Sequence, residues 1–212
     1  MTAASGGGPF VGQIADVAME VDILDEQEAY RGFRRVTTSQ YREKDHGRIS
    51  NRELVRAPDA VALVVYDPKL DRLVMVRQFR FGAQVSTGRG FCCEVVAGLI
   101  DPGEAPETAA ARELEEEAGL TPLRLEKMVS FLTTPGLTDE AIHLFYAEVD
   151  ASDLATVAGA DNENETTYPF MVSLDEALAA VDDNRITNGI AMLAILTFAR
   201  HRETLVSSTV HP

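Results

Sequence analysis

The stretch that decides how this chain folds is GLIDPGEAPETAAARELEEEAGL, residues 98–120. Pro106 stands where a first helical turn tolerates proline, and a run of good helix formers follows it. Gly119 is a typical helix stop, because glycine readily adopts the left-handed backbone conformation that ends many helices. The stretch therefore predicts a loop followed by a helix over residues 106–118.

The second half of this expected helix is crowded with acids at Glu113, Glu115, Glu116 and Glu117. Like charges one turn apart repel each other, and anions near a helix C-terminus oppose the helix dipole. A glutamate run is by default a solvated face. Here, however, helical spacing brings three of the carboxylates to one face and sets Arg112 one turn before Glu116. Such a cluster favours a hard divalent cation, either Mg²⁺ or Mn²⁺.

The overall charge excludes several classes of partner. Among 212 residues, 34 are acidic and 19 are basic, for a net charge of −15. Such a surface repels phosphate backbones and anionic lipids, so we expect no nucleic-acid partner and no membrane partner. Cys92 and Cys93 are adjacent, so they cannot link distant segments through a disulfide bond. This predicts a cytoplasmic protein with reduced thiols.

The rest of the chain reads as strands with few helices. Strands are expected at residues 14–24, 30–39, 60–66, 73–79, 94–97, 131–132, 143–149 and 167–172. We expect Gly98 to break the strand at 94–97, and the polar residues 40–56 to form a joint. Ser173 with Glu176 predicts a capping box that opens a helix to about residue 181, and a last helix is expected at 188–201. This pattern favours an α/β sandwich around a mixed sheet.

At this point the chain resembles a known family. Gly98, Glu104 and residues 112–120 match the Nudix box, G-x5-E-x7-R-E-U-x-E-E-x-G-U with U aliphatic, at every fixed position. A chance match in a chain of this length is on the order of one in a million. The resemblance implies an α/β fold, a Nudix-type α/β/α sandwich around a mixed β-sheet with an N-terminal β arm. It also implies hydrolysis of a nucleoside diphosphate linked to another group.

The resemblance also implies a metal site. Glu113, Glu116 and Glu117 match the side-chain ligands of the family, and Ala97 matches the position whose backbone carbonyl also binds metal. Glu104 would brace the helix from the loop. The implied cofactor is Mg²⁺, with Mn²⁺ as the alternative.

Beyond the box, the chain resembles the ADP-ribose pyrophosphatase branch, with nucleoside-diphosphate-sugar hydrolases close by. In the run RQFR at 77–80, Arg80 would contact the diphosphate, since a guanidinium suits bidentate phosphate contacts. The run FLTTPGLTDE at 131–140 is similar to F-x-S-P-G-G-T-S-E, with Thr134 and Leu137 as departures. There Glu140 would contact the terminal ribose, although an ordinary Pro-Gly turn is the alternative.

The general base is expected among three glutamates. The run DNENE at residues 161–165 resembles the loop that supplies a further carboxylate and the base, so Glu165 comes first and Glu163 second. Glu116 on the helix is a rival, because Nudix members differ in which glutamate deprotonates water.

Parts of the N-terminal region resemble the segments that, in this branch, hold the nucleotide's adenine base. Phe33 and Arg52 are the candidates for an aromatic–arginine sandwich around adenine, with core packing as the alternative for Phe33. We expect a flexible tail at residues 1–12, a β arm for base and dimer contacts at 13–55, and a Nudix catalytic domain at 56–206. In the branch the arm also builds a homodimer, which we expect here.

The expected function is that of an enzyme, a Mg-dependent Nudix pyrophosphatase that splits ADP-ribose into AMP and ribose 5-phosphate. The substrate partner is thus a small-molecule nucleoside diphosphate sugar. One alternative is a hydrolase of GDP-mannose or of another nucleoside diphosphate sugar. Another is a nucleotide-sugar-binding sensor that binds without turnover.

Overall fold

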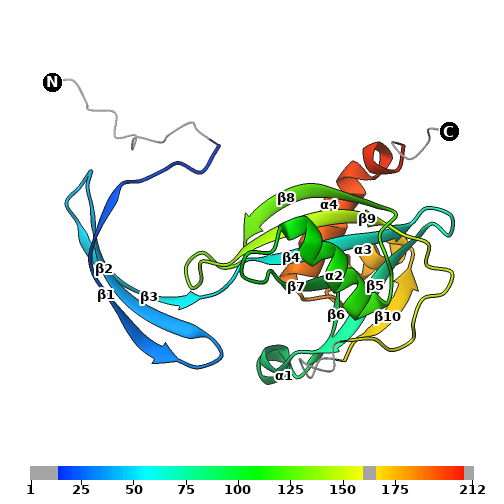
Figure 1. Cartoon of the computed structure of the whole chain (residues 1–212), viewed down its shortest axis with the longest axis horizontal. Helices are drawn as coiled ribbons and strands as arrows, with labels where there is room; N and C mark the ends of the chain where they lie inside the picture. The colour runs from blue at the N-terminus through cyan, green and yellow to red at the C-terminus, as the bar shows by residue number, and fades with distance from the viewer. Residues whose placement is uncertain (1–13, 160–165, 208–212) are drawn as a thin grey trace. The chain divides into compact units, whose positions relative to one another are not determined.

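The computed structural model describes residues 14–159 and 166–207 (Figure 1). The chain divides into two compact units, Met1–Val55 and Arg56–Pro212, here called the N-terminal and C-terminal units. The expected tail at 1–12 lies outside the described residues.

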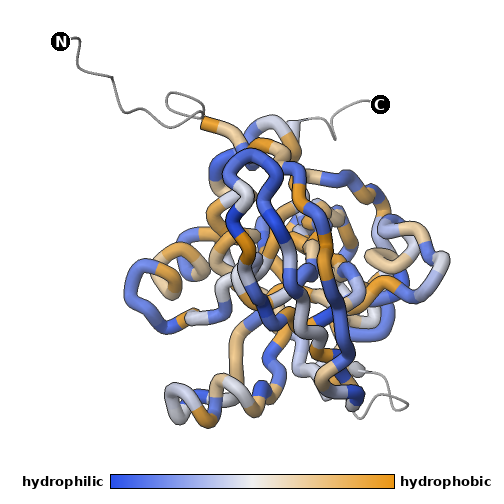
Figure 2. Tube along the Cα trace, turned by 90° about the vertical axis from the view of Figure 1, so that its left-hand side faces the viewer, coloured by the Kyte–Doolittle hydropathy of each residue, from blue (hydrophilic) through white to orange (hydrophobic). Residues whose placement is uncertain are grey.

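The N-terminal unit is a three-stranded sheet in the order β1-β2-β3. Its strands are β1 (Val21–Arg31), β2 (Arg35–Glu43) and β3 (Ile49–Arg56), and β1 pairs antiparallel with β2. All three are largely hydrophilic, as Figure 2 shows. The expectation of a joint at 40–56 is therefore wrong: polar side chains here face solvent from a paired strand, and their polarity hid the strand from the sequence pattern.

The C-terminal unit is built on a seven-stranded sheet. Its strands are β4 (Ala60–Asp67), β5 (Arg72–Phe79), β6 (Phe91–Glu94), β7 (Val96–Leu99), β8 (Arg124–Leu132), β9 (Ala141–Glu148) and β10 (Tyr168–Val172). The main path is β10-β5-β4-β9-β8, while β6 pairs with β5 and β7 pairs with β4. Because β4 and β9 are parallel and the neighbouring pairs are antiparallel, the sheet is mixed.

Strand β4 lies at the centre, and all eight of its residues are buried. Its side chains alternate between two cores, so Val61 and Leu63 pack in the core that contains α2 (Pro106–Ala118). Val64 and Tyr66 pack in the other core, with α3 (Leu174–Asp182) and α4 (Gly189–Ser207). Helices thus cover both faces of the sheet (Figure 1), which confirms the predicted α/β/α sandwich.

The helix ends follow the sequence signals closely. Helix α2 begins at Pro106 and ends before Gly119, whose φ is 67°. The Ser173–Glu176 capping box opens α3. A short helix, α1 (Phe81–Thr87), was not expected, and α4 runs six residues further than expected. Among the described residues, no helix is both long and apolar enough to cross a membrane.

Two strand expectations need correction. Gly98 lies inside β7 and does not end it, since an antiparallel ladder with β4 continues through Leu99. Strand β8 begins at Arg124, seven residues before the expected pair 131–132, because a charged edge strand lacks the apolar alternation of an interior one.

Candidate active site

The acidic helix packs its carboxylates against β7. Glu113 and Glu117 are 8% and 4% exposed, which is unusual for glutamates. The backbone N–H of Ala97 donates to Oε2 of Glu117 over 3.0 Å. The spacing argument therefore holds for these two residues: they share the inner face of α2.

Gly98 makes room for one of these carboxylates. A Cβ at this position would meet the carboxyl carbon and both oxygens of Glu113 at 2.0–2.2 Å, far inside contact distance. Here glycine is required by close approach, because its φ is not in the left-handed region. Gly98 and Glu113, two fixed positions of the Nudix box, thus fit each other sterically.

Arg112 ties the remaining acids together. Its Nη1 donates to Glu113 over 2.7 Å and to Glu116 over 3.0 Å, while Nε and Nη2 contact Glu104 over 3.1 and 3.0 Å. Nη2 also donates to the carbonyl of Leu99 over 2.9 Å. The i,i+4 pair with Glu116 and the bracing role of Glu104 match the sequence-based expectation.

These contacts shift the pKa values of two side chains, Arg112 and Glu104. The hydrogen bond with Glu104, reinforced by Glu113, raises the pKa of the Arg112 guanidinium. The same bond, together with the backbone N–H of Asp101, holds the pKa of Glu104 below its usual value. Both groups are therefore charged throughout the neutral range.

The donor set suits a hard divalent cation. Glu113, Glu116 and Glu117 offer carboxylate oxygens on one helix, and Glu117 also contacts the backbone N–H of Ala97. Oxygen is the ligand type that Mg²⁺ prefers. In the described part of the chain, no group of three or more His, Cys, Asp or Glu side chains converges as a metal cage. Arg112 draws two of the carboxylates toward itself, so ligation would require side-chain rotation.

The C-terminal end of α2 holds both flanks of the segment 160–165. The N–H of Gly159 donates to the carbonyl of Glu116 over 2.8 Å, and the buried Thr167 donates its hydroxyl to the carbonyl of Glu117 over 2.8 Å. The predicted bases Glu163 and Glu165 themselves lie outside the described residues.

Arg80 follows β5 and forms an ion pair that sequence reasoning missed. Its guanidinium contacts the carboxylate of Glu94 over 2.9–3.2 Å, and Asn188 donates Nδ2 to the same carboxylate over 2.8 Å. Glu94 is 4% exposed and pairs with Val76 in the β5–β6 ladder. The sequence signal for this ion pair was Glu94 itself, an acid at the end of the short, otherwise apolar strand β6.

Glu140 lies on a different loop of the C-terminal unit. It accepts a hydrogen bond from the hydroxyl of Thr133 over 3.0 Å, and the neighbouring Asp139 pairs with Arg56 over 2.9 Å. The backbone N–H of Glu140 also donates to the hydroxyl of Thr138 over 3.2 Å. Contacts within the loop and the ion pair of Asp139 with Arg56 therefore hold it in place.

The two base-recognition candidates lie in the N-terminal unit. Phe33 stands between β1 and β2 and is 91% exposed, with the Arg34 guanidinium 5.1 Å from its ring centroid. Phe33 therefore does not pack in the core of its own chain, and the alternative of core packing is wrong. Arg52 on β3 is also exposed, and its Nη1 donates to the carbonyl of Asn51 over 2.8 Å.

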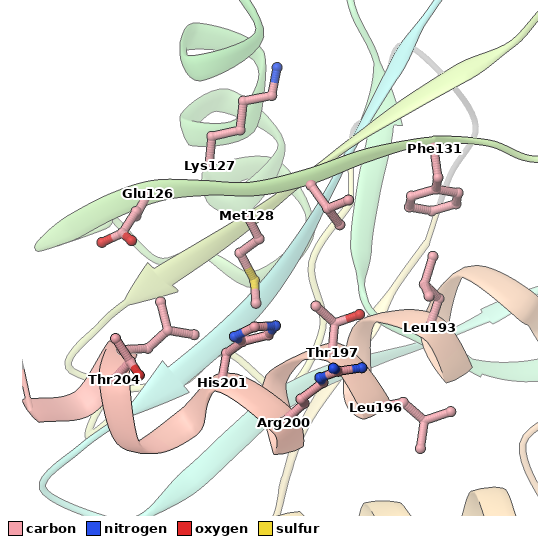
Figure 3. Close-up of a pocket in the computed structure, with 12 residues that line it drawn as sticks. Glu126, Lys127, Met128, Phe131, Leu193, Leu196, Thr197, Arg200, His201 and Thr204 are labelled. Atoms are coloured by element: carbon pink, nitrogen blue, oxygen red, sulfur yellow. The ribbon is translucent and has the colours of Figure 1, made fainter. Parts of the chain in front are cut away.

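A separate cavity of about 650 Å³ lies between β8 and α4 (Figure 3). Its lining is mainly apolar, with Met128, Phe131 and Leu193 among the residues that point into it. None of the predicted site residues lines it, so this cavity is distinct from the acidic site on α2.

Comparisons with known proteins agree with this geometry. The family model described as the NUDIX domain matches residues 56–190. The chain is 34% identical to the ADP-ribose pyrophosphatase of Haemophilus influenzae, over 83% of this chain and 84% of that protein. It is 32% identical to the ADP-ribose pyrophosphatase of Escherichia coli strain K12, over 88% and 91%.

A solved structure shares the fold. The structure described as "Crystal structure of ADP compounds hydrolase" superposes on this chain with a TM-score of 0.69 at 20% sequence identity. The match covers 92% of this chain and 98% of that chain. The matched domain contains every residue of the acidic site on α2 and β7. The chain belongs to the Nudix family.

Proposed function

We propose that this chain is a Nudix pyrophosphatase that hydrolyses the diphosphate bond of ADP-ribose to AMP and ribose 5-phosphate. The observation that carries the proposal is the acidic inner face of α2, where Glu113 fits against Gly98 and Glu117 against Ala97. Relatives named ADP-ribose pyrophosphatase, similar over more than four fifths of the chain, support the choice of substrate.

A divalent cation, which we propose to be Mg²⁺, is the cofactor. Its ligands would be the carboxylates of Glu113, Glu116 and Glu117 and the carbonyl of Ala97, with Mn²⁺ as the alternative metal. Such a cation supplies positive charge beside the diphosphate and makes a nearby water easier to deprotonate. Because the chain carries a net charge of −15, such a cation would also reduce the repulsion between the protein and an anionic substrate.

The chain's own residues would divide the remaining work. Arg80 would donate to the diphosphate oxygens, and Arg112 would hold the carboxylates of α2 in place from behind. A glutamate would take the proton of the attacking water: Glu165 is the first candidate, Glu163 the second, and Glu116 their rival. The anchoring of residues 159 and 167 on the end of α2 supports the first two.

Contacts to the rest of the substrate would come from two further places. We assign the terminal ribose to Glu140 and the adenine to Phe33 and Arg52. The exposed ring of Phe33 is consistent with stacking on a base.

The N-terminal unit would also make a homodimer. Its strand β1 and the residues before it expose large apolar side chains, such as Met19, Ile23 and Leu24, which a second copy of the chain could cover. We propose that this arm spans residues 13–55 and that the catalytic domain spans residues 56–206. A cytoplasmic location, which would suit the free Cys92 and Cys93, also stays a proposal.

A substrate panel tests the function. ADP-ribose, ADP-glucose, UDP-glucose, GDP-mannose and NADH are incubated with the full chain and Mg²⁺, and released nucleotide monophosphate is measured. Fastest turnover of ADP-ribose supports the proposal, and a preference for GDP-mannose replaces it with the sugar-nucleotide alternative. Tight binding of ADP-ribose without any turnover would instead identify a sensor.

A further inference from the structure

A buried carboxylate lies directly behind the exposed guanidinium of Arg80. The Arg80 side chain is 41% exposed, whereas the Glu94 side chain is 5% exposed. Nε and Nη2 of Arg80 lie 3.0 and 2.9 Å from Oε2 of Glu94, and Nε also lies 3.2 Å from Oε1. Two nitrogens on one guanidinium edge thus meet one carboxylate, and this arrangement fixes the plane of the guanidinium.

Asn188 is the third member of this group. Its Oδ1 accepts from the N–H of Ala191 over 2.9 Å, as an N-cap of α4 does, and its Nδ2 donates to Oε1 of Glu94 over 2.8 Å. A reversed amide would place two donors together and an oxygen against the carboxylate. The cap of α4 therefore commits Asn188 to donate to Glu94.

The backbone of Arg80 is fixed as well. Its N–H donates to the carbonyl of Gly90 over 2.7 Å, and its own carbonyl accepts from Gln84 over 3.0 Å. With the backbone held on both sides, the guanidinium is the part that still needs an orientation. Glu94 provides it, on the edge that carries Nε and Nη2.

We propose that Glu94 and Asn188 are positioning residues for Arg80 in diphosphate binding. Burying a carboxylate is costly unless it is paired and hydrogen-bonded. Here Arg80 is the ion-pair partner of Glu94 and Asn188 donates a hydrogen bond to it, so the buried carboxylate can hold the guanidinium in one orientation. A guanidinium held in its binding geometry before substrate arrives loses less conformational entropy on contact. The inference rests on the proposed function, because it assigns Arg80 to the diphosphate.

Steady-state kinetics with ADP-ribose and Mg²⁺ test the inference. Glu94→Gln keeps the volume but removes the charge, and we expect it to raise KM about tenfold with a much smaller change in kcat. Asn188→Ser keeps a cap for α4 but is too short to reach Glu94, and we expect a KM increase of about threefold. Asp183→Asn removes the same charge from an exposed ion pair with Arg185 and serves as the control, with KM unchanged.

The decisive comparison is made in an Arg80→Ala background. If Glu94 acts through Arg80, adding Glu94→Gln there leaves KM where Arg80→Ala alone has put it. A further tenfold rise in that background would overturn the proposal. So would a Glu94→Gln protein that unfolds at a lower temperature but keeps the wild-type KM, because that pattern describes a purely structural pair.

Calorimetric titration with ADP-ribose separates the two proposals. If the wild-type chain binds ADP-ribose without hydrolysing it, the proposed function fails, and Kd replaces KM in the same comparison of variants. If the wild-type chain neither binds nor hydrolyses ADP-ribose, both proposals fail together.

Discussion

Replacing Gly98 by alanine should displace the carboxylate of Glu113. The added Cβ would lie 2.0–2.2 Å from three atoms of that carboxyl group, and Cβ atoms in proteins essentially never come within 3.0 Å of another heavy atom in this way. The carboxylate must therefore move by about 1 Å merely to relieve the clash. Displacements of this size at a reacting centre cost about 100-fold in rate, so kcat/KM for ADP-ribose should fall by about that factor.

The fold should survive this substitution. Overpacking at one position costs about 1–3 kcal/mol, which is less than the stability of a typical domain. The assay measures kcat/KM over a Mg²⁺ titration alongside urea unfolding. Gly82→Ala is the matched control, because a Cβ there meets nothing within 4 Å and the residue lies in α1.

A second substitution tests the steric reasoning directly. In Gly98→Ala combined with Glu113→Asp, the shorter acid withdraws from the new methyl group, so the unfolding free energy should return to that of Glu113→Asp alone. Full activity of Gly98→Ala at wild-type Mg²⁺ concentration would refute the reasoning, because the Glu113 carboxylate would then not depend on the space above Gly98.

Three further predictions concern the same group of side chains. Glu117→Gln can still accept from the N–H of Ala97, so thermal unfolding should be nearly unchanged while kcat/KM drops on the order of 10³-fold. Arg112→Lys loses the forked contacts to three glutamates, and urea unfolding should show a loss of about 2 kcal/mol. The lowered pKa of Glu104 gives stability that is present above its unfolded value of 4.5 and lost as pH falls through its folded value. In urea titrations from about pH 6 to about pH 3, Glu104→Gln should therefore lose less stability than wild type.

Much of the fold could be predicted because its signals are local. The end of α2 depends on one glycine, and the start of α3 depends on a serine and a glutamate three residues apart. Strand β4 reveals itself as a continuous apolar run, since both of its faces are buried. By contrast, β3 and the first half of β8 carry polar side chains, and only pairing with a neighbour makes them strands.

The candidate site shows the same difference between local signals and tertiary packing. The spacing along α2 was enough to bring Glu113 and Glu117 to one face, because helix geometry is regular. The pairing of Arg80 with Glu94 was missed, because the two residues are 14 positions apart and meet through tertiary packing. Asn188, which contacts Glu94, lies a further 94 positions along the chain. The roles of Glu163 and Glu165 stay predictions.

The alternation of β4 between two cores limits how this family member could diverge. Inserting or deleting one residue within Ala60–Asp67 would exchange the faces of every later side chain. Tyr66, which meets Phe198 of α4 with ring centroids 5.2 Å apart, would then be forced beneath α2, where Val65 now stands. Mutations that change length are therefore tolerable in the connecting loops but not in this strand, so inherited variation in β4 should be confined to substitutions of similar size.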